Sequence, residues 1–233
     1  SFLDIKIPIV IWTDLTFDLY QKTYFKKYKK YYLKSYYQGN LLENLSLNKA
    51  EKIIYSTQYA ANNAIKKYRV PKKKINIIPF GFDIDPLSKE EFAEAQKKRV
   101  KMMKVELRFL TVGVDWDRKN MEKNILVIEK LNKLNIKSSL TIIGTKPPKN
   151  FLVPKNVNIV PFLNKKNPNE LNKLKNYYLK SHFFIILSKA EAFGLVVKEA
   201  CAYGLPIIAN NIDGLKYVAS KEFSILVKKN DNV

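Results

Sequence analysis

The sequence predicts an α/β fold in which helices wind around parallel sheets on both sides. Three observations support this prediction. Short β-branched runs, such as "FFIIL" at 183–187, alternate with longer helical stretches along most of the 233 residues. Several of these runs are apolar on both faces, which is typical of strands buried in parallel sheets. Hydrophobic residues make up 46% of the chain, a composition that folds around a core.

The first part of the chain contains three expected strands. A Tyr/Lys-rich stretch at 18–37 separates the first strand from the second. A helix at 88–99 is expected to begin after Ser88, because Ser88 and Glu91 form a capping-box pattern. The strands are expected at 7–12, 52–56 and 75–80, with a further helix at 58–68.

The alternation then restarts, which indicates a second doubly wound unit. Each strand–helix–strand connection is expected to be right-handed. The division falls around 86–104, so we expect one domain at 1–86, a linker helix at 87–104 and a second domain at 105–233. The second domain is expected to have strands at 107–113, 138–144, 157–162, 183–187 and 206–209, and helices at 122–135, 168–180 and 195–203.

The composition narrows the possible partners. The formal charge is +21, but only four of the 42 basic residues are Arg, the side chain that nucleic-acid readers favour. We therefore expect no specific nucleic-acid binding, and an anionic membrane surface or a phosphorylated small molecule fits better. The single Cys excludes an internal disulfide framework, and the single His excludes a His-rich metal site. No apolar run reaches the roughly 18 residues of a membrane span.

The loop after the expected strand at 107–113 has the features of an anion site. Parallel sheets bind ligands at the carboxyl ends of their strands. In "TVGVDWDRKN" at 111–120, Gly113 permits a sharp turn, and Arg118 and Lys119 stand close to the start of a helix. Two cations and free backbone N–H groups suit a diphosphate. A solvated basic loop is the alternative interpretation.

The next strand also ends in a glycine. Gly144 in "TIIGTKPP" is followed by Lys146. Considered alone, this motif is typical of a plain turn glycine, and that interpretation is favoured at this stage.

Two carboxylates flank the turn after the expected strand at 183–187. Glu191 falls in the loop, and Phe193 and Gly194 form the turn. The helix begins at Leu195, so Glu199 lies about one turn into it. Carboxylates accept hydrogen bonds from vicinal hydroxyls of a ribose or a sugar, and a helix N-terminus favours phosphate. The alternative is that Glu191 is solvated and Glu199 only balances charge.

Three stretches together resemble the retaining glycosyltransferases of family four. "SKAEAFGLVVKEACAYGLPIIANNIDGL" at 188–215 resembles the donor-site motif of that family, in which two Glu are separated by seven residues. "FLTVGVDWDRKN" at 109–120 resembles its phosphate loop. "IIYSTQYAANNAIKKYRVPKKKINIIPFGFDID" at 53–85 resembles its interdomain region. The resemblance covers residues 5 to 230, and the Glu pair with its flanks is the specific part.

The resemblance implies a GT-B fold, with two Rossmann-like domains facing across a cleft. Residues 1–86 would be the C-terminal part of an incomplete, acceptor-side domain, so the chain resembles a fragment. Residues 105–233 would be the domain that binds a nucleotide diphosphate sugar.

The resemblance also implies a role for each site residue. Glu191 would contact the transferred sugar and Glu199 the ribose hydroxyls. Arg118 and Lys119 would neutralise the leaving diphosphate, so neither a metal nor a cofactor is expected. The rest of the expected donor site comprises the backbone N–H groups of Phe193, Gly194 and Leu195, the glycines Gly113 and Gly144, and the strand end at Val160 and Phe162, whose backbone would contact the base.

Two positions depart from the family pattern. Asn120 stands where the family often has Gly, so we expect a less tight phosphate loop. Thr13 and Asp14 stand where many members have a His-Asp pair, and Asp14 is our candidate for that catalytic role. The only histidine, His182, is expected to serve packing or to lie at the surface.

The Tyr/Lys stretch at 18–37 has tyrosines and lysines at helical spacing. Tyr20, Tyr24, Tyr28 and Tyr31 form one stripe, and Lys22, Lys26, Lys30 and Lys34 form another. Such a helix suits an anionic membrane. An ordinary surface helix that buries its Tyr rings is at least as good an interpretation, and stacking on RNA is the weakest.

The function that the resemblance implies is that of a hexosyltransferase-like enzyme, which transfers a sugar from a nucleotide diphosphate sugar with retention of anomeric configuration. The acceptor would be a glycan or lipid-linked saccharide, as in cell envelope polysaccharide synthesis. The protein would be cytoplasmic and peripheral at the inner face of the membrane. The alternatives are a non-catalytic module that binds nucleotide sugar or membrane, and a nucleotide-sugar epimerase.

Overall fold

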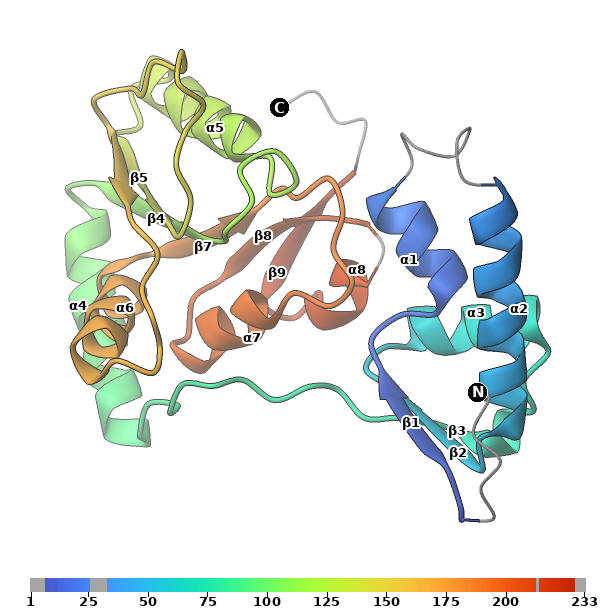
Figure 1. Cartoon of the computed structure of the whole chain (residues 1–233). Coiled ribbons are helices and arrows are strands. Elements are labelled where there is room, and N and C mark those ends of the chain that lie inside the picture. Colours follow the sequence, from blue (N-terminus) through green and yellow to red (C-terminus); the bar gives the residue numbers. More distant parts are fainter. Residues whose placement is uncertain (1–6, 26–32, 213, 229–233) are drawn as a thin grey trace. The chain divides into compact units, whose positions relative to one another are not determined.

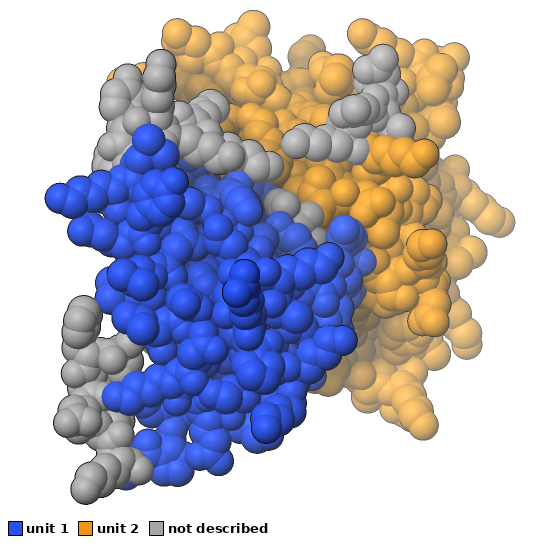
Figure 2. Space-filling view, turned by 90° about the vertical axis from the view of Figure 1, so that its right-hand side faces the viewer, with its two compact units in different colours: residues 1–80, 190–194, 213–218 blue, residues 81–189, 195–212, 219–233 orange. Residues whose placement is uncertain are grey.

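The computed structural model describes residues 7–25, 33–212 and 214–228. By its internal contacts the chain divides into two compact units, which Figure 2 colours separately. Unit 1 comprises 1–80, 190–194 and 213–218, and unit 2 comprises 81–189, 195–212 and 219–233. Each unit contains a sheet whose strands are all parallel. The expected α/β class with parallel sheets is confirmed.

Unit 1 is built on a three-stranded sheet in the order β1-β2-β3. The strands are β1 (Val10–Thr13), β2 (Lys52–Tyr55) and β3 (Ile75–Ile77). β3 is shorter than the expected strand at 75–80, because Pro79 has no N–H to donate to a ladder. The helices are α1 (Phe17–Tyr24), α2 (Leu33–Lys49) and α3 (Gln58–Tyr68), followed by the short 3-10 helix η2 (Lys72–Lys74).

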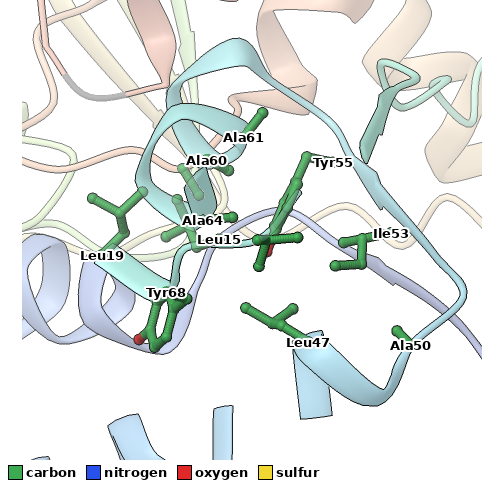
Figure 3. Packing of buried hydrophobic residues seen from close by; sticks show 12 residues of the cluster. Leu15, Leu19, Leu47, Ala50, Ile53, Tyr55, Ala60, Ala61, Ala64 and Tyr68 are labelled. Carbon is green, nitrogen blue, oxygen red and sulfur yellow. The ribbon is translucent and has the colours of Figure 1, made fainter. Parts of the chain in front are cut away.

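The core of unit 1 gathers apolar side chains from the sheet and all three helices (Figure 3). The alanine-rich face of α3 allows the helix to lie close to β2, because a methyl group needs little space. The buried residues of this core are Leu15, Leu19, Leu47, Ala50, Ile53, Tyr55, Ala60, Ala61, Ala64, Tyr68, Val70 and Ala192.

The Tyr/Lys stretch does not form one continuous helix. α1 ends at Tyr24, with Phe25 as its C-cap, and α2 begins at Leu33. The expected stripes at 18–37 are therefore divided between two helices, and the prediction of a single amphipathic face is wrong. Four residues of those stripes, Lys26, Tyr28, Lys30 and Tyr31, lie outside the described residues.

A buried carboxylate joins the helices of unit 1 instead. Asp18 in α1 accepts hydrogen bonds from Lys22 at 2.7 Å, from Asn63 of α3 at 3.0 Å and from the Tyr36 hydroxyl of α2. Burial alone would raise the pKa of Asp18, but these hydrogen bonds outweigh it and lower the pKa below its usual value. The stretch that looked like a membrane surface thus contributes polar groups to the interior.

Unit 2 is built on a six-stranded sheet in the order β6-β5-β4-β7-β8-β9. All five strands expected in this part of the chain are present. Their bounds, with that of the added edge strand β9, are β4 (Leu107–Val112), β5 (Ser138–Ile143), β6 (Val157–Val160), β7 (Phe183–Ile186), β8 (Ile207–Asn210) and β9 (Ser224–Val227).

Helices cover both faces of this sheet, and Figure 1 shows α5 on the side opposite α6 and α7. The helices are α4 (Lys89–Met103), α5 (Met121–Lys133), α6 (Pro168–Lys180) and α7 (Leu195–Ala202); the short α8 (Leu215–Val218) belongs to unit 1. None of the helices in the described parts of the chain is long and apolar enough to cross a membrane.

The helix α4 packs on the rest of unit 2 through a buried arginine. The capping box of Ser88 and Glu91 is formed as expected, but the helix continues beyond residue 99. Arg99 donates to the carbonyl oxygen of Tyr178 at 3.0 Å and to that of Gly204 at 3.3 Å. These carbonyls lie near the ends of α6 and α7, where the helix dipole favours a cation.

Candidate functional site

The sheet of unit 2 reverses its winding between β4 and β7. From β4 the chain proceeds outward through β5 to β6, and it then returns to form β7 on the other side of β4. Ligands of open α/β sheets bind outside the carboxyl ends of the strands at such a reversal. The loops that follow β4 and β7, at 113–120 and 187–189, therefore form the candidate site in unit 2.

The loop after β4 holds both expected cations. A Cβ at Gly113 would lie 2.9 Å from carbon atoms of the Lys119 side chain, so the lysine stem lies across the glycine. Lys119 is buried, which excludes the interpretation that it is a solvated surface lysine. The Arg118 side chain is partly exposed, and its Nε lies 3.4 Å from the Asp115 carboxylate. The same carboxylate accepts the Arg118 backbone N–H at 3.0 Å and holds the turn.

Asn120 closes this loop in the conformation that glycine would adopt. Its φ is 54° and its ψ is 48°, in the left-handed region that Asn tolerates better than most residues. The Asn120 N–H donates to the Asp117 carbonyl at 3.0 Å, and Asn120 is the N-cap of α5. Asn120 thus makes the left-handed turn at the position where the family often has Gly.

Gly144 does more than close a turn. Its φ is +100°, and a Cβ there would lie 3.1 Å from the Gly113 carbonyl oxygen. The two glycines thus lie against each other at the ends of the neighbouring strands β4 and β5, and the absence of a side chain at Gly144 allows this close approach. The Gly144 N–H donates to the Val160 carbonyl at 3.0 Å, so one lone pair of that oxygen is already used. Phe162, two residues further on, is exposed.

Glu199 of α7 is almost completely buried, with 1% of its surface exposed. The Tyr178 hydroxyl donates to one carboxylate oxygen at 2.9 Å, and the Lys165 ammonium binds the other. Burial, reinforced by Glu199, raises the pKa of Tyr178 well above its usual value, so the phenol stays a donor. A carboxylate has about four lone-pair positions, and these two partners use two of them. Lys165 thus balances the charge of Glu199, as the alternative interpretation expected, and together with Tyr178 it holds the carboxylate in place.

The turn that contains Glu191 clusters with unit 1. Glu191 is buried, and its carbonyl oxygen accepts the Gly214 N–H at 3.1 Å. Gly194 has a φ of +88°, and the buried Phe193 packs edge-on against Phe80, with 5.3 Å between the ring centroids. α7 then begins at the exposed Leu195, as expected.

Asp14 lies at the carboxyl end of β1, in a cavity of about 290 Å³ in unit 1. Thr13, Tyr20 and Glu43 also line this cavity. Burial raises the pKa of Glu43, whose carboxylate accepts the Phe17 N–H at 3.2 Å. Asp14 thus has a second carboxylate as its neighbour, which the sequence did not indicate.

His182 has a structural role in unit 2. The backbone N–H of His182 donates to the Arg108 carbonyl oxygen at 2.8 Å, and the imidazole Nδ1 accepts the backbone N–H of Arg108 at 2.9 Å. Burial and then the charge of Arg108 lower the pKa of His182, so the imidazole is neutral. The expectation of a packing role is confirmed.

Sequence reasoning missed the side chains that hold the site residues. Lys165 and Tyr178 are 34 and 21 residues from Glu199, and Tyr178 lies in α6 whereas Lys165 lies in the loop before it. Asn124 and Asn210, which bind the chain after β7, are 63 and 23 residues from Leu187. The only local signal was the polar character of these residues within otherwise apolar elements.

Comparisons with known proteins agree with this architecture. Residues 92–233 match the family model described as "Glycosyl transferases group 1". The chain is 30% identical over 182 residues to the UDP-Gal:alpha-D-GlcNAc-diphosphoundecaprenol alpha-1,3-galactosyltransferase of Escherichia coli. The aligned region covers 72% of this chain and 44% of that protein. The three curated relatives are matched over 40%, 48% and 44% of their lengths, so this chain spans less than half of each.

Solved structures resemble the chain in fold. WaaG, a glycosyltransferase involved in lipopolysaccharide biosynthesis, superposes with a TM-score of 0.69 at 18% identity. The superposition covers 97% of this chain and 63% of the WaaG chain. Anabaena HepE, solved with UDP-glucose, has a TM-score of 0.60 at 14% identity and covers 94% of this chain and 58% of its own. These similarities confirm the GT-B fold class expected from the sequence.

Proposed function

The chain belongs to the group 1 glycosyltransferases, and we propose that unit 2 binds a nucleotide diphosphate sugar at the carboxyl ends of β4 and β7 for transfer of the sugar to an acceptor. The observation that carries the proposal is the position of Arg118 and Lys119. Both cations follow β4, at the reversal of the sheet, beside the bare backbone of Gly113 and Gly144. The negative charge of a diphosphate suits these two cations.

In the proposed reaction the bond between the anomeric carbon and the diphosphate breaks, the oxygen of an acceptor hydroxyl forms the new bond with retention of configuration, and the hydroxyl proton leaves with the diphosphate. Arg118 and Lys119 stabilise the charge that develops on the departing diphosphate, which a metal does in other enzymes. Glu199 accepts hydrogen bonds from the ribose hydroxyls through its two remaining lone-pair positions. Glu191 contacts the transferred sugar, and Asp14 acts on the acceptor side.

The donor and the acceptor are also proposals. A uridine nucleotide is the first donor to test, because HepE has been solved with UDP-glucose. A glycan or lipid-linked saccharide is the proposed acceptor, since the Escherichia coli relative is named for a diphosphoundecaprenol substrate. The formal charge of +21 supports a cytoplasmic protein that binds the anionic inner face of a membrane.

The test is calorimetric titration of the chain with UDP-, GDP- and ADP-sugars. The variant Arg118→Met keeps the aliphatic stem and removes the charge, and we expect it to weaken binding by about 10- to 100-fold, the value of a charged hydrogen bond. Arg69→Met is the matched control, because Arg69 is exposed in unit 1. A folded wild-type chain that binds none of the three nucleotide sugars would overturn the proposal.

A further inference from the structure

Three asparagines hold the backbone of Leu187, the residue that follows β7. The Leu187 N–H donates to the Asn124 carboxamide oxygen at 3.2 Å. The carboxamides of Asn120 and Asn210 both donate to the Leu187 carbonyl oxygen, each at 3.0 Å. Leu187 has left the strand ladder, so side chains from α5, its N-cap and β8 satisfy the buried peptide group in place of a neighbouring strand.

Further contacts join the same two loops. The Lys189 N–H donates to the Arg118 carbonyl at 2.8 Å, and the Lys189 ammonium lies 2.5 Å from the Asp117 carboxylate. The basic loop at 115–120 and the segment at 187–189 are therefore hydrogen-bonded to each other at the junction of β4 and β7, which Figure 1 shows as neighbours. The segment leads directly to Glu191.

Asn120 is the residue that contributes to both loops. Its backbone makes the left-handed turn from the basic loop into α5, and its carboxamide reaches across to Leu187. Glycine would make the same turn but could not supply the hydrogen bond. The carboxamide makes no capping bond to its own helix, and it donates instead to the Leu187 carbonyl oxygen.

We propose that Asn120 is a positioning residue that couples the diphosphate-binding loop to the segment at 187–189, which follows β7. The inference rests on the proposed function, in which Arg118 and Lys119 bind the diphosphate. The physical reason is orientation: a ligand gains most from two loops that already have the correct relative geometry. Loss of the link removes one of the contacts that hold the segment at 187–189 against the basic loop and so loosens their relative geometry.

The test compares Asn120→Gly with Asn135→Gly. Both asparagines have a left-handed backbone, with φ of 54° and 61°, so glycine removes the same backbone strain in each variant. Asn135 is exposed in the turn after α5 and serves as the matched control. The probes are UDP, GDP and ADP with their monophosphates, measured by calorimetry, and hydrogen exchange of the peptide covering 183–189.

We expect Asn120→Gly to weaken diphosphate binding about five- to tenfold, the effect of one lost hydrogen bond, while monophosphate binding changes less than about twofold. Exchange in 183–189 should also become faster, and the control should change neither quantity. A loss of overall stability alone would weaken both nucleotides equally, so the selectivity for diphosphate identifies a positioning role.

Two outcomes separate this inference from the proposed function. If the wild type binds none of the diphosphates, the proposed function fails, and the positioning role for diphosphate binding fails with it. If the wild type binds a diphosphate but both variants behave alike in binding and exchange, only the coupling through Asn120 is overturned.

Discussion

The hydrogen bond from Tyr178 to Glu199 offers a sharp test of how the site is held. Tyr178→Phe removes only the hydroxyl that donates to the buried carboxylate at 2.9 Å. The ring itself should stay, because it stacks on Tyr203 with 5.4 Å between the centroids and also packs against Phe184 at 6.3 Å. The variant therefore isolates one hydrogen bond without creating a large cavity.

The expected cost follows from burial. A hydrogen bond to a charged group contributes about 1.5–3 kcal/mol to the free energy of unfolding, and a buried acceptor that loses its donor is penalised by a similar amount. Glu199 keeps Lys165 as its second partner, so we expect a loss of about 2 kcal/mol. In a chain of this size that corresponds to a fall in Tm of about 4–8 °C.

The assay is thermal and urea unfolding followed by circular dichroism. Tyr177→Phe is the matched control, because it makes the same chemical change at the next residue, which is only half-buried. We expect the control to lose less than about 0.5 kcal/mol, as is usual for substitutions away from buried contacts. If both variants lose the same stability, the reasoning that Tyr178 holds Glu199 is refuted.

Three further predictions concern the buried polar groups and the glycine pair. Asp18→Asn should destabilise unit 1 by about 3 kcal/mol, because Lys22 loses the buried carboxylate that it binds. The pKa of Asp18 is lowered in the folded protein, so the wild type should lose this contribution as the pH falls below about 4. Midpoints of urea unfolding between pH 3 and 7 would show both effects. Burial raises the pKa of Tyr203 to about 12, so the unfolded chain ionises first and stability should fall between pH 10 and 12; an unchanged Tm across that range would contradict this. Gly144→Ala should lower the free energy of unfolding by about 1–3 kcal/mol, because the added Cβ would meet the Gly113 oxygen and because φ is +100°. Gly81→Ala is the control and should be nearly neutral in the same unfolding assay, since no atom lies within 4 Å of the added Cβ.

The elements of unit 2 could be predicted from sequence because their signals are local. A run such as "FFII" is apolar over its whole length, and it became β7 at 183–186. Capping residues and glycines marked the ends, so helices such as α6 were located to within a few residues. The same logic placed the candidate ligand loops at the carboxyl ends of the strands.

The Tyr/Lys stretch shows where a periodic pattern misleads. Residues spaced by four predict a helical face, but the pattern contains no signal for where one helix stops and the next starts. The chain forms α1 and α2 here, and Asp18 joins them from within. A polar residue in such a stretch can face the interior once a second helix supplies its partners.

By itself the sequence determined the α/β class, the position of most elements, the basic loop and the pair of glutamates, because each depends on residues close together in the chain. Only the tertiary structure decided what holds them. The order of the strands, β5-β4-β7-β8, brings Asn120, Asn124 and Asn210 to Leu187, although they are 67, 63 and 23 residues from it in sequence. Long-range pairing of this kind depends on which strands become neighbours, and no local pattern of residues encodes that choice.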